Sequence, residues 1–472
     1  MSYFNANNAP SNGYANYGGD LSTNQFETIP KPGCNYIITK TVLSGNRHSS
    51  FRGSYELKYI QTGRLSNEGE KREDKQRMKR IGNIWDSMLE ETNGINAVIE
   101  GTRKKRKSRE IKKLLYDEEA VNEVKNRWHR VNPEKAAEYV QPIIEELRNG
   151  TWKHSSPRCK RQFCKSRTHT GGKWRELYIT NLKDHTVAHM VMNVTEKAFL
   201  KGMHPGCCGS VPGRGIRYAL KRIRNWMQHD KQCRYFVKLD IRHFFDNING
   251  DVLKKKLAEK IKDKDVLQVF GLIIDSAPVA CPVGYYTSPW LANLYLEKLD
   301  WFITQQLYKE RREKRINFVR HYIRYADDML LIGTSKADLK SAIYAVRDEL
   351  SKIGLELKPE WEIKKIGKHV TVNGKWKLKK GTYWCDIVGY RFCKDSVQLR
   401  DGIYLASTRL ARKMYKQQYY TKNQCESINA RLGWAAHCDS RRFLEDCIKP
   451  YVNIKLTRRI IGCGSEQKTV KT

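Results

Sequence analysis

The sequence has few acidic residues for its number of basic ones. Its 472 residues include 51 Asp and Glu against 88 Lys and Arg, so the formal net charge is +37. It also lacks an uninterrupted apolar run near the ~20 residues that a membrane-spanning helix requires, and its mean hydropathy is −0.69. The N-terminus has no basic segment followed by an apolar one, as a signal peptide would. We therefore expect a cytoplasmic protein with no membrane partner.

The cysteine pattern of a disulfide framework is missing as well. The 13 cysteines are odd in number, which is typical of a reducing compartment. Gly213-Arg214-Gly215 lacks the following Lys and Ser or Thr of a Walker loop. These absences argue against a disulfide-rich secreted protein and against a P-loop nucleotide-binding site.

The chain does contain enough apolar residues, 40%, for a folded core. A large positive charge on a globular chain indicates a polyanionic partner, above all nucleic acid. The densest basic run includes Lys104, Lys105, Arg106 and Lys107. We predict that this run contacts nucleic-acid phosphates; a solvated helix face or a targeting signal is the alternative.

Hydrophobic periodicity predicts a mixed α and β chain. The predicted helices are residues 81–99, 117–150, 184–199, 288–307 and most of 402–460. The clearest predicted strands are residues 36–39, 235–239, 322–325 and 329–333. Residues 1–33 are rich in Asn, Gly, Ser and Tyr, and we predict that they form a disordered tail.

Acidic residues stand where two of these strands end. Asp240 follows the strand 235–239, and Asp327-Asp328 lie at the turn between the strands 322–325 and 329–333. Neighbouring carboxylates repel one another unless they are neutralised, and nucleotidyl transfer uses a pair of divalent cations that would neutralise them. Mg²⁺ prefers such oxygen ligands, and Mn²⁺ is a second possibility. On spacing alone, ordinary acidic turns remain the alternative.

The residues around these acids resemble the palm motifs A, B and C of reverse transcriptases, in the same order. The three segments are Asp240-Ile-Arg-His-Phe-Phe245-Asp, Pro282-Val-Gly284-Tyr-Tyr-Thr-Ser288-Pro289 and Tyr325-Ala-Asp327-Asp328. Further segments resemble two fingers motifs, motif D, motif E and the thumb; they are Arg175-Glu-Leu-Tyr, Ser210-Val-Pro-Gly213-Arg214-Gly215, Gly354-Leu-Glu-Leu-Lys358, Ile387-Val-Gly389-Tyr390 and Leu432-Gly-Trp-Ala-Ala-His437. The resemblance covers about residues 80–460 and is to bacterial enzymes of the group II intron-like lineage.

This resemblance implies an α+β right-hand polymerase with fingers, a palm made of an antiparallel sheet with helices, and a helical thumb. The expected domains are a basic N-terminal extension over 34–115, fingers over 116–234, a palm over 235–395 that includes part of the fingers, and a thumb over 396–472.

The resemblance also implies roles for individual residues. Asp240, Asp327 and Asp328 are the expected catalytic and metal-binding residues, together with the Ile241 carbonyl. The ring of Phe245 is expected to exclude a ribose 2′-hydroxyl, with a core role as the alternative. Arg175, Arg214, Gly284 and Lys358 are expected to contact the nucleotide, and Ser288, Gly389 and Tyr390 the nucleic acid. Two assignments stay open: Arg214 as a surface charge, and Lys364 in place of Lys358.

The implied activity is RNA-directed DNA synthesis on a dedicated, non-coding RNA, with cDNA as the product. The biological setting is antiviral defence, a diversity-generating retroelement or a reduced intron-like element. Trp361 favours the diversity-generating group, whereas Ser288-Pro289 is the commoner form of motif B, so the subfamily stays open. The alternative functions are a non-catalytic, maturase-like RNA-binding scaffold and an RNA-templated RNA polymerase. An accessory protein or a second copy of the chain is a possible partner.

Two cysteine-containing segments suggest weaker alternatives. His154, Cys159, Cys164 and His169 could form a zinc site, although their spacing lacks the usual close cysteine pair. The competing prediction is a β-hairpin whose basic residues face nucleic acid; these are Arg158, Lys160, Arg161 and Lys165. For Cys207 and Cys208 we predict ordinary packing.

Overall fold

The computed structural model describes three short strands within residues 1–79, and then residues 80–103, 105, 108–115, 131–165, 172–372, 375–417, 419–462 and 469–470. The chain separates into two compact units, with the boundary between Lys79 and Arg80. The smaller unit holds an antiparallel sheet in the order β1 (Thr28–Ile29), β2 (Tyr36–Thr39) and β3 (Glu56–Tyr59). The predicted strand at 36–39 is confirmed. Strand β1 lies within the predicted tail 1–33, whose other residues lie outside the described residues, so disorder of that tail stays a prediction.

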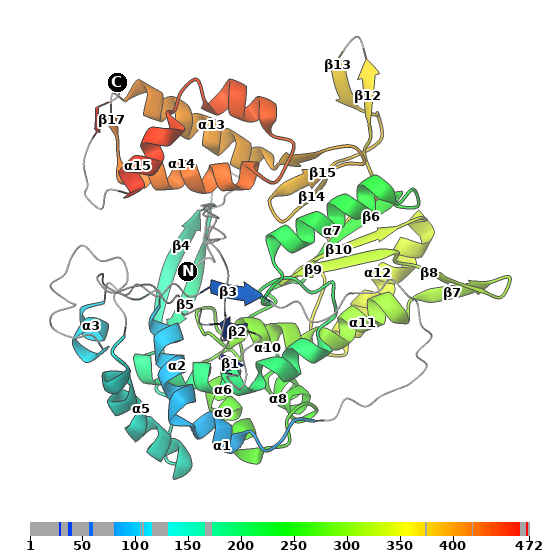
Figure 1. Ribbon diagram of the computed structural model, residues 1–472. Helices are drawn as coiled ribbons and strands as arrows, with labels where there is room; N and C mark the ends of the chain where they lie inside the picture. Colours follow the sequence, from blue (N-terminus) through cyan, green and yellow to red (C-terminus); the bar gives the residue numbers. More distant parts are fainter. Residues whose placement is uncertain are drawn as a thin grey trace, which may run out of the picture. The chain divides into compact units, whose positions relative to one another are not determined.

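The larger unit begins with a group of helices: α1 (Trp85–Leu89), α2 (Glu91–Thr102), α3 (Arg109–Leu115), α5 (Pro133–Arg148) and α6 (Leu182–Gly202). Helix α2 packs on both α5 and α6 (Figure 1). This packing is close because Gly94 faces Val140, where an added Cβ would lie 2.2 Å from a methyl carbon. Asn132 caps α5 by accepting hydrogen bonds from the Glu134 and Lys135 amides. Of the helix predicted over 117–150, residues 117–130 lie outside the described residues.

A β-hairpin lies between α5 and α6 in the sequence. Strand β4 (Arg158–Lys165) pairs antiparallel with β5 (Gly172–Ile179), and Asn181 then caps α6 by accepting from the Asp184 amide. The predicted hairpin in this segment is therefore confirmed. At the hairpin, Phe163 and Trp174 are opposite one another and largely exposed, with their ring centroids 5.3 Å apart.

The central element is a four-stranded antiparallel sheet in the order β11 (Lys364–Lys365), β6 (Tyr235–Asp240), β10 (Asp328–Gly333) and β9 (His321–Tyr325). Its strands separate two hydrophobic cores because successive side chains alternate between the faces. Met329 and Leu331 belong to the core shared with α11 and α12 (Lys336–Ser351), and Leu330 and Ile332 to the core shared with α7 (Ile216–His229). Figure 1 shows α7 lying across this sheet.

The expected long helix over 288–307 is two helices, so this prediction is wrong in its continuity. Helices α10 (Ser288–Tyr295) and α11 (Glu297–Gln305) are separated at Leu296, whose φ of −95° and ψ of 1° depart from the helix. The break lets α10 pack on α8 (Gly250–Ala258), while α11 packs on β9 and α12. Tertiary packing on two different partners therefore overrides the continuous apolar pattern. Helix α9 (Lys264–Asp275) follows α8 and packs against it.

Two further hairpins extend from the larger unit, β7 (Tyr308–Arg311) with β8 (Lys314–Asn317) and β12 (His369–Val372) with β13 (Lys375–Leu378). A small sheet of β14 (Cys385–Ile387), β15 (Tyr390–Phe392) and β16 (Val397–Leu399) follows.

The end of the chain is helical, as predicted: α13 (Asp401–Lys416), α14 (Lys422–Ala435), a π-helix (Phe443–Ile448) and α15 (Ile454–Gly462), with β17 (Tyr419–Tyr420) pairing β18 (Thr469–Val470). Within the described residues, every helix is too short or too polar to cross a membrane. The predicted limits between extension, fingers, palm and thumb stay predictions.

Candidate active site

The sheet register brings the three predicted aspartates together. Asp328 begins β10 directly opposite Asp240, the last residue of β6. Asp327 occupies the two-residue turn between β9 and β10, where Ala326 adopts a left-handed φ of 57°. Residues almost ninety positions apart in the sequence therefore form one carboxylate cluster at the end of the sheet.

The cluster carries unfavourable charge in the absence of a cation. Burial, followed by the charges of Asp328 and Asp240, raises the pKa of Asp327 to about 6. Burial also raises the pKa of Asp328, although Lys238 opposes this effect. A low local dielectric penalises the charged form of each acid, and the neighbouring acids add repulsion. Such perturbed groups are typical of functional sites.

The donor set fits a divalent cation. Oδ1 of Asp240 is buried and has no hydrogen-bond partner among the described residues. A buried carboxylate oxygen without a donor is costly, and three converging carboxylates supply the hard oxygen ligands that Mg²⁺ prefers. Ile241, whose carbonyl is a predicted ligand, is 1% exposed and pairs with Leu357 in an isolated bridge.

Lys358 reaches this cluster, whereas Lys364 does not. Nζ of Lys358 donates to Oδ2 of Asp240 at 2.8 Å, and its backbone amide donates to the Asp240 carbonyl at 2.9 Å. The hydrogen bond to Asp240 raises the pKa of Lys358. Lys364 instead forms an ion pair with Glu362 at 3.0 Å. The structure thus places Lys358 beside the aspartates and keeps it charged.

A buried ionic network supports the aspartate turn, and the sequence analysis missed it. Arg324 is fully buried and donates from Nε and Nη2 to the Asp300 carboxylate at 2.7 and 2.6 Å. Its Nη1 donates at 3.0 Å both to Asn293 Oδ1 and to the carbonyl of Ala326 in the turn. The Tyr322 hydroxyl donates to the same Asp300 at 2.6 Å. The available signal was an arginine inside the apolar strand 322–325, but its partner lies on a distant helix.

The segment 207–209 lies directly against this turn. The Cys208 amide donates to the Arg324 carbonyl at 2.9 Å, and a Cβ on Gly209 would lie 2.6 Å from the Ala326 nitrogen. Cys207 and Cys208 are fully buried, as we predicted, and burial raises the pKa of the Cys207 thiol to about 11. They pack the turn and stay protonated.

The loop before α10 is fixed to the β4–β5 hairpin. Gly284 has a φ of +122°, and a Cβ there would lie 2.4 Å from the Tyr178 carbonyl oxygen. The Tyr178 amide donates to the Val283 carbonyl at 2.9 Å. The Ser288 hydroxyl is buried and donates to Pro282 at 2.8 Å. Gly284 is thus required for a close backbone approach, and the Ser288 hydroxyl holds the loop.

Phe245 lies five residues beyond Asp240 and packs, half-buried, against the main core. Its ring centroid is 5.2 Å from that of Phe244, which is fully buried.

The two predicted arginines differ in their surroundings. Arg175 lies half-buried on β5, and its Nε has no hydrogen-bond partner among the described residues. Nη1 of Arg214 donates to the carbonyls of His204 and Cys207 at 2.7 and 3.0 Å. Arg214 therefore braces its own loop with one nitrogen, and the nucleotide contacts predicted for both residues stay predictions.

The predicted motif E residues pack on the helical end of the chain. Gly389 has a φ of +87°, and a Cβ there would lie 2.4 Å from the Trp434 ring. Tyr390 is 2% exposed, and its hydroxyl donates to the Trp434 carbonyl at 3.0 Å. These residues hold the turn between β14 and β15 on α14.

Two sequence predictions fall partly or wholly outside the described residues. In the basic run, Lys105 is described and exposed, and its amide donates to the Thr102 carbonyl at 2.7 Å; Lys104, Arg106 and Lys107 lie outside. In the suggested zinc set, His169 also lies outside.

The remaining members of that zinc set do not converge. His154 has a nearly buried ring that stacks on Tyr285 at 5.4 Å and lies 3.7 Å from Asp184. Cys159 and Cys164 are five positions apart on β4, so their side chains leave opposite faces of the strand. The zinc interpretation of this segment is therefore wrong.

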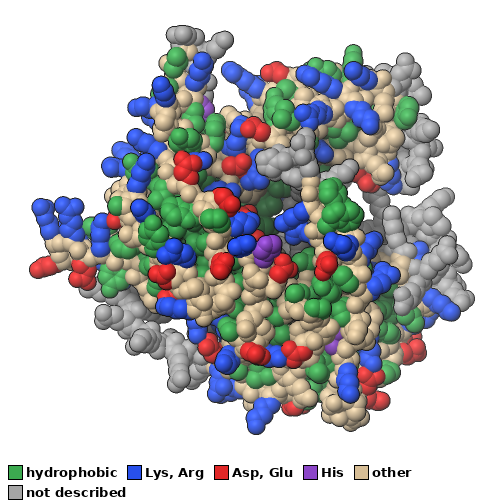
Figure 2. Space-filling view, turned by 180° about the vertical axis from the view of Figure 1, so that it is seen from behind, with side chains coloured by type: hydrophobic (Ala, Val, Ile, Leu, Met, Phe, Trp, Pro, Cys, Tyr) green, Lys and Arg blue, Asp and Glu red, His purple; other side chains and the backbone are tan. Residues whose placement is uncertain are grey.

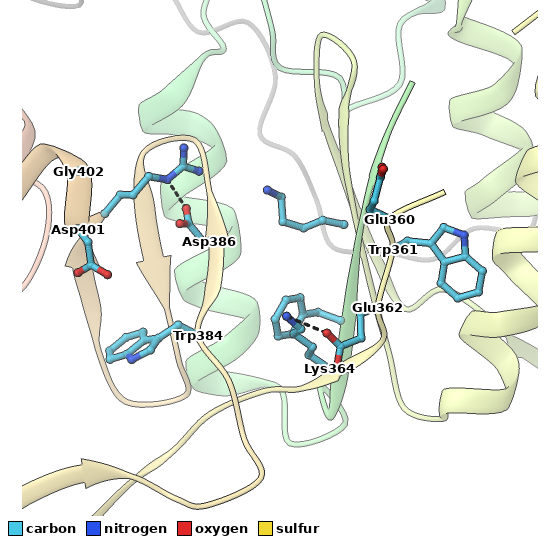
Figure 3. A pocket seen from close by; sticks show the side chains of 11 residues that line it. Glu360, Trp361, Glu362, Lys364, Trp384, Asp386, Asp401 and Gly402 are labelled. Carbon is cyan, nitrogen blue, oxygen red and sulfur yellow. Dashed lines mark hydrogen bonds and ion pairs between the residues drawn. The ribbon is translucent and has the colours of Figure 1, made fainter. Parts of the chain in front are cut away.

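A cavity of about 730 Å³ opens beside β6, the strand that ends at Asp240, and was not predicted. It is bounded by β6, the segment 360–364, the segment before β14 and the start of α13 (Figure 3). Lys238, two residues before Asp240 on the same face of β6, lines it together with Trp361 and Trp384. Arg400 and Asp386, also in its wall, form an ion pair. Four segments that are distant in sequence build this cavity, so no local pattern indicates it.

Comparisons with known proteins identify the domain that holds this site. Residues 165–361 match the family model described as reverse transcriptase (RNA-dependent DNA polymerase). The retron Ec73 reverse transcriptase of Escherichia coli is 27% identical over 197 residues, which cover 40% of this chain and 58% of that protein. The group II intron-encoded protein LtrA of Lactococcus lactis subsp. cremoris is 28% identical over 186 residues, which cover 37% of this chain and 30% of that protein.

An uncharacterized 91 kDa protein in the cob intron of Schizosaccharomyces pombe is 32% identical over 144 residues, which cover 28% of this chain and 17% of that protein. The matched segments thus span less than two thirds of these relatives. Among solved structures, apo telomerase from Candida tropicalis matches with a TM-score of 0.39 and 12% identity, covering 64% of this chain and 58% of that one. The family match places the three aspartates within a recognised domain: the chain carries a reverse transcriptase domain of mixed α and β structure, similar to those of retron and group II intron proteins.

Proposed function

We propose that the protein is an RNA-directed DNA polymerase that copies a dedicated, non-coding RNA into cDNA. The register that places Asp328 opposite Asp240, with Asp327 in the adjoining turn, carries this proposal. A non-catalytic scaffold gains nothing from acids that repel one another in a partly buried site, whereas a metal-dependent polymerase requires them.

Asp240, Asp327, Asp328 and the Ile241 carbonyl are the residues that would hold Mg²⁺ or Mn²⁺. When bound, the metal pair activates a 3′-hydroxyl and stabilises the leaving pyrophosphate. Lys358 already holds a charged ammonium 2.8 Å from Asp240. We assign it to the pyrophosphate side, where a positive charge stabilises the leaving group. Phe245 limits the space for a 2′-hydroxyl, so deoxynucleotides are the favoured substrates.

Several exposed features suit a nucleic-acid template. Phe163 and Trp174 present rings at the β4–β5 hairpin, and bases stack on such rings without sequence preference. Figure 2 shows basic side chains on both projecting hairpins. The exposed basic residues are Lys309, Arg311, Arg312, Lys314 and Arg315 on the β7–β8 hairpin, and Lys368, Lys377, Lys379 and Lys380 on or beside the β12–β13 hairpin. Phosphate contacts by such residues would supply most of the non-specific affinity.

The biological setting we propose is antiviral defence or a diversity-generating retroelement. The similarity to a retron reverse transcriptase and to an intron-encoded protein supports a polymerase that works on a particular RNA. We place the protein in the cytoplasm, with an accessory protein or a second copy of the chain as its protein partner. Sequencing the nucleic acid that copurifies with the protein tests this setting, because random cellular RNA contradicts a dedicated template.

The activity is tested by dNTP incorporation on a primed RNA template. Asp240→Asn and Asp327→Asn should each abolish incorporation, because each removes a proposed metal ligand. Asp246→Asn is the matched control, since Asp246 follows β6 in the sequence but is exposed, and its one ion pair among the described residues is with His243 at 3.7 Å. Incorporation by both active-site variants at the control rate would contradict the proposal. RNA binding that survives in them separates catalysis from a scaffold role.

A further inference from the structure

A second cluster of metal-ligating side chains lies outside the active site, at the base of the β12–β13 hairpin. His369 begins β12, while Cys393 and Asp395 lie in the turn that joins β15 to β16. Their donor atoms lie within 4.8 Å of one another. The cluster therefore joins the hairpin to the small sheet that carries Gly389 and Tyr390.

The separations between these donors are close to those around a tetrahedral zinc ion. Cys393 Sγ lies 3.7 Å from His369 Nδ1 and 3.1 Å from Asp395 Oδ1, and Nδ1 lies 2.8 Å from Oδ1. Bonds of ~2.3 Å to sulfur and ~2.1 Å to nitrogen place those two atoms ~3.6 Å apart at a tetrahedral angle. The nitrogen–sulfur separation already fits. The carboxylate needs to recede by roughly 0.5 Å to reach the oxygen position, which a small side-chain rotation provides.

The charge at this cluster also favours a cation. Among the described residues, Asp395 accepts hydrogen bonds from the Cys393 thiol, from the His369 ring and from the His369 amide at 2.9 Å, and it forms no ion pair with Lys or Arg. The otherwise similar cluster of Asp230, Cys233 and His321 differs, because Arg320 already forms an ion pair with Asp230. At that cluster, Arg320 offsets the charge of the Asp230 carboxylate and competes with a metal ion.

Burial and ligand type select the metal. Cys393 is 1% exposed and the His369 side chain 7%, whereas the Asp395 side chain is 26% exposed. A thiolate and an imidazole are soft or intermediate ligands that suit zinc and not magnesium. The exposed side of Asp395 supplies an entry path and room for a water as fourth ligand, since three protein ligands leave one position open.

We propose that His369 Nδ1, Cys393 Sγ and Asp395 Oδ1 bind one Zn²⁺ ion. Binding displaces the thiol proton to solvent, and the imidazole coordinates through Nδ1 with its proton on Nε2. The ion fixes the base of the β12–β13 hairpin to the β15–β16 turn, beside the existing hydrogen bond from the Lys394 amide to the Gly367 carbonyl at 2.8 Å. Its role is structural and independent of the proposed polymerase chemistry.

The test is a Zn²⁺ titration of the full chain after treatment with a chelator, with Mg²⁺ in excess to occupy the active-site carboxylates. A chromophoric zinc chelator serves as competitor. The parent protein should bind one equivalent, and Cys393→Ala and Asp395→Asn should each lower the affinity at least tenfold. Asp439→Asn is the matched control, because Asp439 also accepts a backbone hydrogen bond, from the Val397 amide at 2.7 Å, but belongs to neither cluster of metal-ligating side chains among the described residues.

Cobalt substitution keeps the proposal testable if a variant fails to fold. Co²⁺ bound to the parent protein should give the spectrum of a tetrahedral site with a thiolate charge-transfer band. Failure of the folded parent protein to bind Zn²⁺ would overturn the proposal. So would a Co²⁺ spectrum without thiolate ligation, or equal affinity in the parent and in folded Cys393→Ala protein.

Discussion

At the scale of single residues, the aspartate cluster lowers the stability of the metal-free protein, because it gathers the carboxylates that the proposed chemistry needs. The raised pKa of Asp327, about 6, means that folding favours its protonated form. An acid whose pKa is raised on folding costs stability as the pH rises from its unfolded value near 4 to its folded value near 6. Above that window the cost is fully present, and a bound cation removes it.

We therefore expect Asp327→Asn to stabilise the metal-free protein at pH 8. The shift of about two pKa units corresponds to at most ~3 kcal/mol, and partial solvent exposure reduces the expected gain to roughly 1–2 kcal/mol. Urea unfolding in the presence of a chelator measures it. At pH 3, below the unfolded pKa, the gain should largely vanish, because Asp327 is then mostly protonated in both states. Asp246→Asn should leave the stability unchanged at both pH values, and a loss of stability in Asp327→Asn at pH 8 would refute the repulsion.

Phe245 gives a second prediction at this scale. Phe245→Ala should raise the ratio of ribonucleotide to deoxynucleotide incorporation, because it removes the ring proposed to clash with a 2′-hydroxyl. Overpacking costs ~1–3 kcal/mol, so the ratio should rise roughly tenfold to a hundredfold. The control is Phe244→Leu, which alters the neighbouring core side chain without opening that space. An unchanged ratio in Phe245→Ala would assign the residue to the core alone.

At the scale of elements, the aspartate turn depends on a network that lies behind it. Arg324 holds the Ala326 carbonyl and is itself held by Asp300 on α11 and Asn293 on α10. The break at Leu296 lets α10 pack on α8 and α11 on β9 and α12, and each helix contributes a polar side chain to the same guanidinium. The element that the sequence pattern misjudged is thus the one that supports the site.

Arg324→Met should lower the free energy of unfolding by about 3–5 kcal/mol, because it leaves the Asp300 carboxylate buried without its partner. Incorporation should fall as well, since the turn loses its brace. Adding Asp300→Leu removes the orphaned charge, so the double variant should regain part of the stability without regaining activity. Chemical denaturation and primer extension measure the two effects. Additive losses in the double variant would show that the two residues act separately.

The contrast between local patterns and contacts between distant segments explains what could be predicted from the sequence. Strands β6, β9 and β10 and the acids at their ends follow local rules, since alternating or continuous apolar runs end in polar turns. The partner of Arg324, the cavity beside Lys238 and the His369–Cys393–Asp395 cluster depend on which distant segments meet. The motifs indicated the active-site residues because each motif preserves the geometry of a local turn. The His369–Cys393–Asp395 cluster forms only where the β12–β13 hairpin packs against the β15–β16 hairpin.

At the scale of the whole molecule, the net charge of +37 predicts how RNA binding responds to salt. Each neutralised phosphate releases a counterion, so the logarithm of the affinity falls linearly with the logarithm of the salt concentration. A slope of roughly −0.7 per phosphate contact is expected on single-stranded RNA. Several contacts therefore give a steep dependence.

Substitutions in the basic run 104–107 test whether the charges that contact RNA are spread over the surface or concentrated in this run. Replacing Lys104, Lys105, Arg106 and Lys107 together by Ala should flatten the slope by roughly two to three units if each contacts a phosphate. Fluorescence anisotropy over a series of salt concentrations measures the slope. Replacing Lys314 and Arg315 with Ala is a useful comparison, because these exposed residues lie on the separate β7–β8 hairpin. If only the second variant flattens the slope, the hairpin contacts the RNA and the run is a solvated surface. If neither variant flattens the slope, the phosphate contacts are distributed over the rest of the basic surface, and RNA binding depends on the total positive charge.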